Sequence, residues 1–193
     1  MTYDPERHHR RSIRLRDYDY AQAGAYFVTI CTHERRCLFG RIVGGEVRLS
    51  SIGRIVEEEW RRTADVRPDV DLDAFVVMPN HIHGIIVLTR PDFLPVGATR
   101  WVARSPTPTP RSRTPPKGPP PGSLGAIVSQ VKSVVTKRVA RSGDDATFPL
   151  WQRSFYEHVV RNDRQLERFR TYVIANPAVW TDDGLHPDNS TKW

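Results

Sequence analysis

The most informative part of the chain for predicting its fold is LDAFVVMPNHIHGIIVL, residues 72–88. Two apolar runs, Leu72–Met78 and His81–Leu88, flank Pro79-Asn80, a dipeptide typical of tight turns. We therefore predict two neighbouring strands joined as a hairpin. Side chains two residues apart on a strand point to the same face, so His81 and His83 should project side by side while Ile82 faces the core.

Strand and helix signals alternate on both sides of this hairpin. Apolar residues recur at helical spacing in some segments, and β-branched or aromatic residues cluster in others. The predicted elements are a strand at Tyr26–Thr32, a small hairpin of Arg41–Val43 and Glu46–Leu49 around Gly44-Gly45, a helix at Ser51–Arg62, a helix at Leu124–Arg141, a strand at Trp151–Val160, and a helix from the N-cap Asn162 to about Asn176. This order matches a split β-α-β unit, so we predict an α+β fold: a ferredoxin-like (RRM-like) antiparallel sheet with helices on one side plus an extra C-terminal helix.

The chain has 193 residues, of which 38% are hydrophobic and 26% charged, as expected for a globular protein. Ten prolines lie between Pro91 and Gly122, in a segment that can neither pack a core nor pair in a sheet. We predict a single domain at residues 1–180, with a Pro-rich basic insertion at 91–122 and a C-terminal tail at 181–193. No apolar run reaches the roughly 18–20 residues that span a bilayer. Only Cys31 and Cys37 occur, which predicts reduced thiols in a cytoplasmic protein.

The net charge of +7 is concentrated in one region. Residues 91–141 hold nine Lys or Arg and a single acid, Asp92, so they account for the whole excess of positive charge. A local basic region predicts a polyanionic partner, of which nucleic acid is the commonest. The alternative is a charged linker that only keeps the protein soluble.

Two imidazoles two residues apart on a strand can hold one divalent cation and leave room for a substrate oxygen. The alternative is a pair of surface or hydrogen-bonded histidines. A third ligand could come from the C-terminal helix, where Tyr172 and Asn176 lie four residues apart and share a face. Tyr172 could equally be a half-buried core tyrosine, and Asn176 a helix C-cap before Pro177.

Together these motifs resemble the single-tyrosine HUH transposases, and within them most closely the REP-associated tyrosine transposases. The resemblance rests on H-x-H after M-P-N on a strand, and on a helix that ends Tyr-Val-x-x-Asn-Pro. It extends over about residues 11–90 and 123–180. Further matching stretches are Arg11-Ser-Ile-Arg-Leu15, Tyr18-Asp-Tyr20, Gly24–Thr32, Leu38-Phe-Gly40, Gln130-Val-Lys-Ser133 and Leu150–His158.

The resemblance implies a ferredoxin-like sheet with the HUH strand near its centre, and a role for individual residues. His81 and His83 take the positions of the metal-binding histidines, Asn176 that of the third ligand and Tyr172 that of the nucleophile, and the metal is Mg²⁺ or Mn²⁺. The implied enzyme is a DNA transposase or endonuclease that cleaves and rejoins single strands through a 5′-phosphotyrosine, at hairpin (REP-like) elements. The resemblance implies that its partner is single-stranded or hairpin DNA and that it is located in the cytoplasm, in association with the nucleoid. It also implies that the protein is a monomer or a homodimer.

Alternatives to these assignments exist at each level. Tyr156 is the nearby rival nucleophile, although it falls on a predicted strand. The competing function is a catalytically inactive nucleic-acid-binding module on the same fold, which has no need of both histidines, Tyr172 and Asn176 together. A zinc hydrolase is disfavoured, because no third His, Cys or carboxylate stands at a recognisable spacing. The predicted DNA contacts are Arg11, Arg14, Lys132, Lys137, Arg138 and Arg153.

Overall fold

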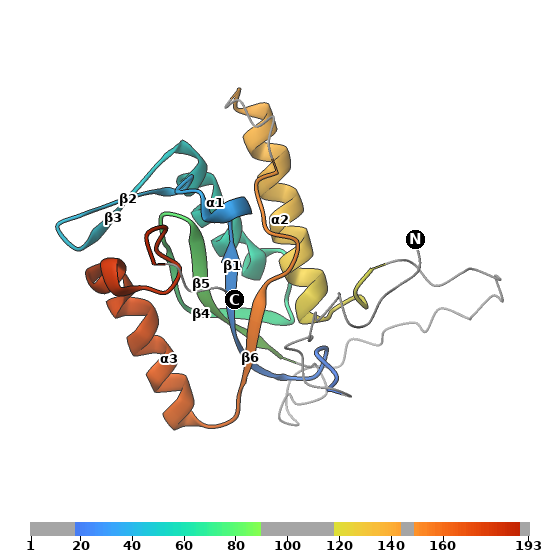
Figure 1. The fold of residues 1–193 in the computed structure, drawn as a ribbon. Helices are drawn as coiled ribbons and strands as arrows, with labels where there is room; N and C mark the ends of the chain where they lie inside the picture. Colours follow the sequence, from blue (N-terminus) through green and yellow to red (C-terminus); the bar gives the residue numbers. More distant parts are fainter. Residues whose placement is uncertain (1–17, 90–117, 144–148, 190–193) are drawn as a thin grey trace, which may run out of the picture.

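A computed structural model describes residues 18–89, 118–143 and 149–189 of the chain. These residues include a four-stranded antiparallel sheet with the strand order β4-β5-β1-β6 (Figure 1). Its strands are β1 (Gly24–Cys31), β4 (Val70–Val77), β5 (His81–Leu88) and β6 (Tyr156–Val160). One helix lies between the first and second of these strands and another between the third and fourth, which is the ferredoxin-like topology. The predicted α+β fold class is confirmed.

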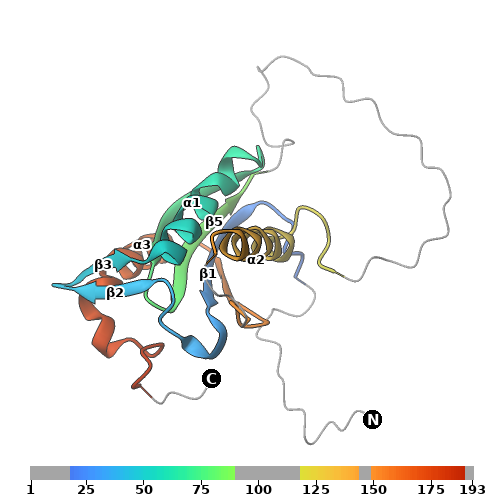
Figure 2. The same cartoon turned by 90° about the horizontal axis from the view of Figure 1, so that it is seen from above.

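One face of the sheet is covered by two helices, as Figure 2 shows from above. These are α1 (Ser51–Asp65), three residues longer than predicted, and α2 (Leu124–Arg141). Alternation along β1 sends Tyr26, Val28 and Ile30 into the core beneath them. Trp60 of α1, which is 1% exposed, packs so closely on β5 that a Cβ at Gly84 would lie 2.4 Å from its ring. The glycine after the H-x-H motif is therefore required by packing.

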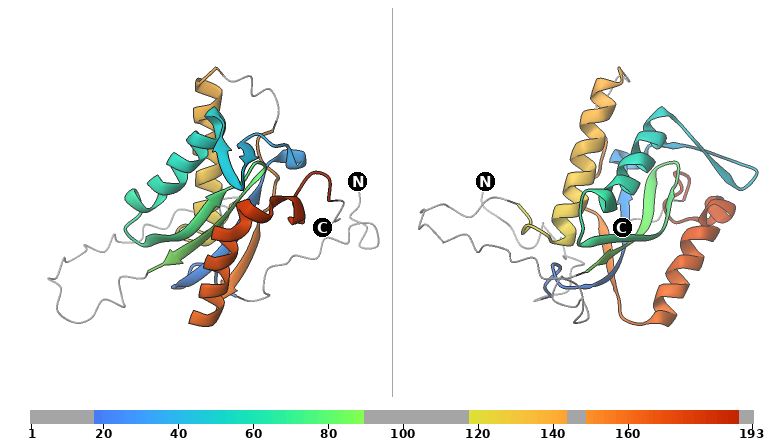
Figure 3. Two further views of the ribbon diagram at one scale, coloured as in Figure 1. Left: turned by 90° about the vertical axis from the view of Figure 1, so that its left-hand side faces the viewer. Right: turned by 180° about the vertical axis from the view of Figure 1, so that it is seen from behind.

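Helix α3 (Asp163–Ala175) packs on the opposite face, so the sheet lies between α3 and the other two helices (Figure 3). As predicted, Asn162 caps the helix: its side chain accepts a 2.9 Å hydrogen bond from the Gln165 N–H. Val173 is fully buried against Phe27 of β1 and Ile85 of β5. These contacts orient the face of α3 that carries Tyr172 toward the sheet.

An ion pair anchors the middle of α3 to the edge strand β4. Arg170 donates two hydrogen bonds, of 2.9 and 2.5 Å, to the two carboxylate oxygens of Asp73. Asp73 lies where the register between β4 and β5 shifts, between Leu72 and Phe75. This irregularity places the carboxylate within reach of the helix.

The strand predicted at Trp151–Val160 is shorter in the structure, because β6 begins only at Tyr156. Trp151 makes a single bridge to Thr32. Beyond it, the Lys132 ammonium donates hydrogen bonds of 2.8 and 3.0 Å to the carbonyls of Gln152 and Ser154. A side chain of α2 thus binds carbonyls that a longer strand would direct to its neighbour. We call residues 152–155 the edge loop.

The predicted small hairpin is present as β2 (Gly40–Val43) and β3 (Glu46–Leu49), a separate two-stranded sheet. Gly44 and Gly45 have φ of 60° and 78°. Positive φ at both central positions is what the favoured two-residue hairpin turn requires, and glycine adopts it without strain.

The chain after α3 folds back onto the domain. Asn176–Asp182 form a 3-10 helix, and Leu185 beyond it is buried. The Asn80 amide donates a 2.8 Å hydrogen bond to the Leu185 carbonyl, which ties this segment to the start of β5. Within the segment expected as a tail, 181–193, residues 183–185 contact the domain.

The Pro-rich insertion predicted at 91–122 lies outside the described residues except for its last five, 118–122. Within the described part of the chain, no helix combines the length and apolarity needed to cross a bilayer.

Candidate active site

The two histidines of the H-x-H motif lie side by side at the start of β5, as predicted. Their ring centroids are 4.3 Å apart, and the exposed fractions are 0% for His81 and 2% for His83. Ile82 between them is buried in the core under α1 and α2. Because burial disfavours the charged imidazolium, the pKa of His81 lies well below its usual value and that of His83 is lowered to about 3. Both rings are neutral at physiological pH, the form that binds metals.

Asn80 determines which nitrogen of His81 carries the proton. Its Nδ2 donates hydrogen bonds of 3.0 and 2.8 Å to the carbonyls of Arg35 and Leu185, which fixes the orientation of the amide. Asn80 Oδ1 then lies 2.8 Å from His81 Nδ1, and an amide oxygen can only accept. The proton is accordingly on Nδ1, and Nε2 presents its lone pair to the site.

A carboxylate that sequence analysis did not identify completes the group. Asp183 is 8% exposed, and its Oδ1 accepts a 2.6 Å hydrogen bond from the Leu185 N–H. Its Oδ2 lies 3.8 Å from His81 Nε2 and 4.0 Å from His83 Nε2. One ligand atom from each of the three residues lies within 4.8 Å of the others, so the group could hold a metal ion. Because both imidazoles are neutral, they form no ion pair with the Asp183 carboxylate. A cation bound between the three side chains would explain why they lie together.

Three buried polar atoms here have no hydrogen-bond partner within the part of the chain that the structure describes: His81 Nε2, Asp183 Oδ2 and Asn176 Oδ1. Buried polar atoms are nearly always paired, so three unpaired acceptors in one region need an explanation. Imidazole nitrogens and carboxylate or amide oxygens are ligands that suit divalent cations such as Mn²⁺ and Mg²⁺. His81, His83 and Asp183 therefore fit a divalent metal. Asn176, the predicted third ligand, has a buried side-chain oxygen without a partner among the described residues.

Tyr172 faces the same group from α3. Its Oη is 3.2 Å from His83 Nε2, and the tyrosine is 44% exposed, so a substrate can reach it. Burial, and after it the Asp183 carboxylate, raise the pKa of Tyr172 to about 12, against a hydrogen bond with Asn176 that lowers it. The phenol is protonated at neutral pH, and a positive charge beside Asp183 would ease its deprotonation.

Tyr172, His83 and Asp183 line one end of a groove of about 1710 Å³. From there the groove runs past β6 and the edge loop to the first turns of α2. Two of the predicted DNA contacts, Lys132 and Arg153, line it.

The other predicted DNA contacts lie elsewhere. Arg138 of α2 binds Glu58 and Glu59 of α1 at 2.6 and 2.7 Å, so its charge is already compensated. Lys137 is exposed on α2 but does not line the groove. Arg11 and Arg14 lie outside the described residues.

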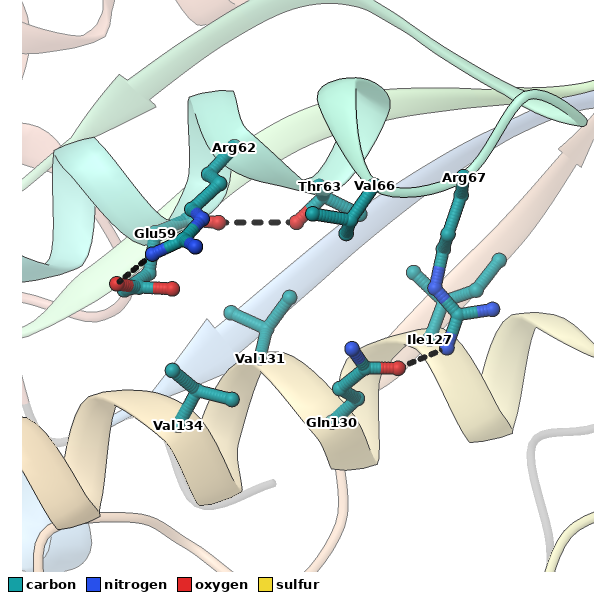
Figure 4. Close-up of a pocket in the computed structure, with 9 residues that line it drawn as sticks. All are labelled: Glu59, Arg62, Thr63, Val66, Arg67, Ile127, Gln130, Val131 and Val134. Atoms are coloured by element: carbon teal, nitrogen blue, oxygen red, sulfur yellow. Dashed lines mark hydrogen bonds and ion pairs between the residues drawn. The ribbon is translucent and has the colours of Figure 1, made fainter.

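A smaller cavity of about 230 Å³ lies between α1 and α2, beneath the other face of the sheet (Figure 4). Its charged groups contact neighbours within the cavity: Arg67 donates to Gln130, and Arg62 lies 3.9 Å from Glu59. Neither histidine nor Tyr172 lines it. The groove is therefore the candidate active site.

Sequence reasoning missed two residues of this site. Asn80 stands inside the quoted motif, but its pattern points only to a turn. An amide directly before a metal-binding histidine is the signal that could have identified it. Asp183 stands in Thr181-Asp-Asp-Gly184, beyond the last matching motif, and no spacing in the sequence connects it to the histidines.

Comparisons with known proteins give a relative by sequence and similar solved structures. No protein-family model matches the sequence. An uncharacterized protein of Haemophilus influenzae is 34% identical over 186 residues, which cover 96% of this chain and 98% of the relative. Among solved structures, a REP-associated tyrosine transposase bound to a REP hairpin is similar with a TM-score of 0.53 and 18% identity, over 86% of this chain and 73% of that one. At that identity the likeness concerns the fold.

Proposed function

The chain belongs to the same protein family as the Haemophilus influenzae relative, and we propose that it is a metal-dependent single-tyrosine HUH transposase. Its fold, which is that of a REP-associated tyrosine transposase, supports this proposal. It cleaves and rejoins single-stranded DNA at hairpin elements of the REP kind, in the cytoplasm at the nucleoid. The observation that carries the proposal is the 3.2 Å contact between Tyr172 Oη and His83 Nε2. It puts a nucleophile directly against the pair of histidines that could hold a metal.

In this proposal His81, His83 and Asp183 hold Mg²⁺ or Mn²⁺, with the Asn176 oxygen as a further ligand. When bound, the ion polarises a phosphate oxygen and stabilises the developing charge, an effect worth several kcal/mol. Asn80 acts through His81, whose Nε2 it keeps free of a proton.

Tyr172 carries out the covalent step. Its Oη forms a bond to the phosphorus of the scissile phosphodiester while the bond from phosphorus to the 3′ oxygen breaks. Oη loses its proton and the departing 3′ oxygen gains one, so one ester replaces another and no nucleotide is consumed. The hydrogen bond from Asn176 favours the phenolate, and the same step in reverse rejoins strands.

All of these residues come from one molecule. Helix α3 packs on the sheet of its own chain, and Tyr172 contacts His83 directly. We therefore propose that a monomer suffices for cleavage.

The covalent intermediate provides the test. Single-stranded oligonucleotides that carry palindromes from beside the gene are incubated with protein and Mg²⁺ and run on a denaturing gel. The parent should give an SDS-resistant adduct on the 5′ side of the break. Tyr172→Phe, which removes only Oη, should give neither nick nor adduct. Tyr18→Phe, which removes a hydroxyl 3.4 Å from Tyr26 Oη in a different part of the domain, should react like the parent.

Peptide mass spectrometry then locates the nucleotide. An adduct on Tyr156, or one that persists in Tyr172→Phe, refutes the assignment of the nucleophile. Binding without any adduct in the parent favours the alternative function, an inactive nucleic-acid-binding module.

A further inference from the structure

The groove extends well beyond the residues that the chemistry needs. Helix α3 packs mainly over β4 and β5, and residues of β1 and β6 beside it form the floor of the groove. Thr29 of β1 lies opposite Tyr156 of β6 on this floor, and the edge loop forms the far wall. With about 1710 Å³, the groove exceeds the roughly 300–1,000 Å³ of small-molecule pockets, which indicates an extended ligand.

Two tyrosines flank a single ring on this floor. Tyr172 packs edge-on against Phe27 at a centroid distance of 6.0 Å, and Tyr156 packs edge-on against the same ring at 6.4 Å. Phe27 is itself held in place by stacking on Phe169 at 4.5 Å. Tyr156 is 38% exposed and lines the groove, so a ligand in the groove can reach this side chain.

The groove is also positively charged. Four Lys or Arg line it, against the one carboxylate of Asp183. Arg168 lies one helical turn before Tyr172, on the same face of α3, and is exposed. Arg153 is exposed on the edge loop, whose backbone is fixed by the two hydrogen bonds from Lys132. Cations on both walls suit a ligand with repeated negative charges.

We infer that this groove binds the single DNA strand that leads to the scissile phosphate, with the adjoining base stacked on Tyr156 and phosphates bound by Arg153 and Arg168. The inference rests on the proposed function, and it assigns Tyr156 to substrate binding instead of nucleophilic attack. An exposed ring beside cations is the arrangement that proteins use for unpaired nucleic acid, because every unpaired base offers a π-face. The bases of a duplex are stacked and paired, so Tyr156 selects against double-stranded DNA.

The test measures binding without cleavage. Fluorescence anisotropy follows a 5′-fluorescein-labelled oligothymidylate of about 20 nucleotides, longer than most single-strand sites, in buffer with EDTA. Tyr156→Ala should weaken binding at least about fivefold, the lower end for one stacked base, and Tyr156→Phe should restore most of the loss because it keeps the ring. A duplex of the same length should show no effect of Tyr156→Ala.

Charge is tested with a matched pair of double variants. Arg153→Gln with Arg168→Gln should make the slope of log affinity against log salt shallower by about 1.4, or about 0.7 for each lost phosphate contact. Arg41→Gln with Arg54→Gln removes the same charge from exposed positions outside the groove and should leave the slope unchanged.

Equal slopes in the two double variants, or equal affinities of Tyr156→Ala and the parent, overturn the groove proposal even where the parent forms its adduct. A larger loss for an RNA oligomer than for DNA also overturns it, in favour of RNA. Conversely, groove effects in a parent that forms no adduct would uphold the binding site and reject the transposase function, so the two failures are distinguishable.

Discussion

Replacing Asp183 with Asn should stabilise the metal-free protein and weaken its response to metal. The Asp183 carboxylate is buried, and its Oδ2 has no hydrogen-bond partner among the described residues while it faces His81 Nε2 at 3.8 Å. An amide keeps the Oδ1 acceptor for the Leu185 N–H and brings a donor to the position of Oδ2. That donor can reach the lone pair of His81, so one substitution removes an unpaired charge and adds a hydrogen bond.

The two effects differ in sign and can be estimated separately. An unsatisfied buried polar group costs about 1–3 kcal/mol. The 3.8 Å between the Oδ2 position and His81 Nε2 must shorten for a hydrogen bond to form, so we expect the free energy of unfolding of Asp183→Asn in EDTA to exceed that of the parent by about 1–2 kcal/mol. At Mn²⁺ one hundred times above its dissociation constant, the parent gains about 2.7 kcal/mol. A variant that binds tenfold more weakly gains only about 1.4 kcal/mol under the same conditions.

Guanidinium unfolding followed by tryptophan fluorescence, in EDTA and in excess Mn²⁺, measures both quantities. Asp182→Asn removes the neighbouring, exposed carboxylate and serves as the matched control, which should change neither quantity by more than about 0.5 kcal/mol. A variant less stable than the parent in EDTA would falsify the view that Asp183 is held in place for a cation. A variant with the full Mn²⁺ response would remove Asp183 from the ligand set.

Three further outcomes are expected. Asn80→Ala should lower the affinity for Mn²⁺, measured by calorimetry, by about 10- to 100-fold, because His81 loses the partner that orients it; unchanged affinity would contradict that role. Gly84→Ala should destabilise the protein by about 1–3 kcal/mol, since the new Cβ meets the buried Trp60 ring at 2.4 Å, whereas Gly118→Ala, with nothing within 4 Å, should not. In EDTA the free energy of unfolding should fall from pH 7 to pH 5, because His83 in the unfolded chain binds a proton below a pKa of about 6.5, whereas in the folded chain its pKa is about 3. This contribution alone is about 2 kcal/mol. A free energy of unfolding that does not change with pH in chemical denaturation would argue against buried neutral histidines.

Local patterns were sufficient for most of the fold. The period of two along His81–Leu88 correctly assigned Ile82 to the core and both histidines to the other face. The cap at Asn162 correctly predicted the start of α3. The strand at Trp151–Val160 was predicted too long, because propensity carries no information about a lysine from another helix that binds its carbonyls.

Features whose parts are close along the chain could be predicted from the sequence: the strands, the helices, the paired histidines, and a tyrosine and an amide one helical turn apart. The way in which distant segments meet could be seen only in the folded chain. The hydrogen bond that joins Asn80 to Leu185 spans 105 residues, and it is this contact that holds the chain where Asp183 faces the histidines. Arg138, which counted as a DNA contact by its charge, is compensated by Glu59, 79 residues away. The periodicity of a sequence indicates which face of a helix or strand a residue occupies. The partner of that residue depends on how separate helices and strands pack against one another, and this packing is determined by all the side chains of the core together.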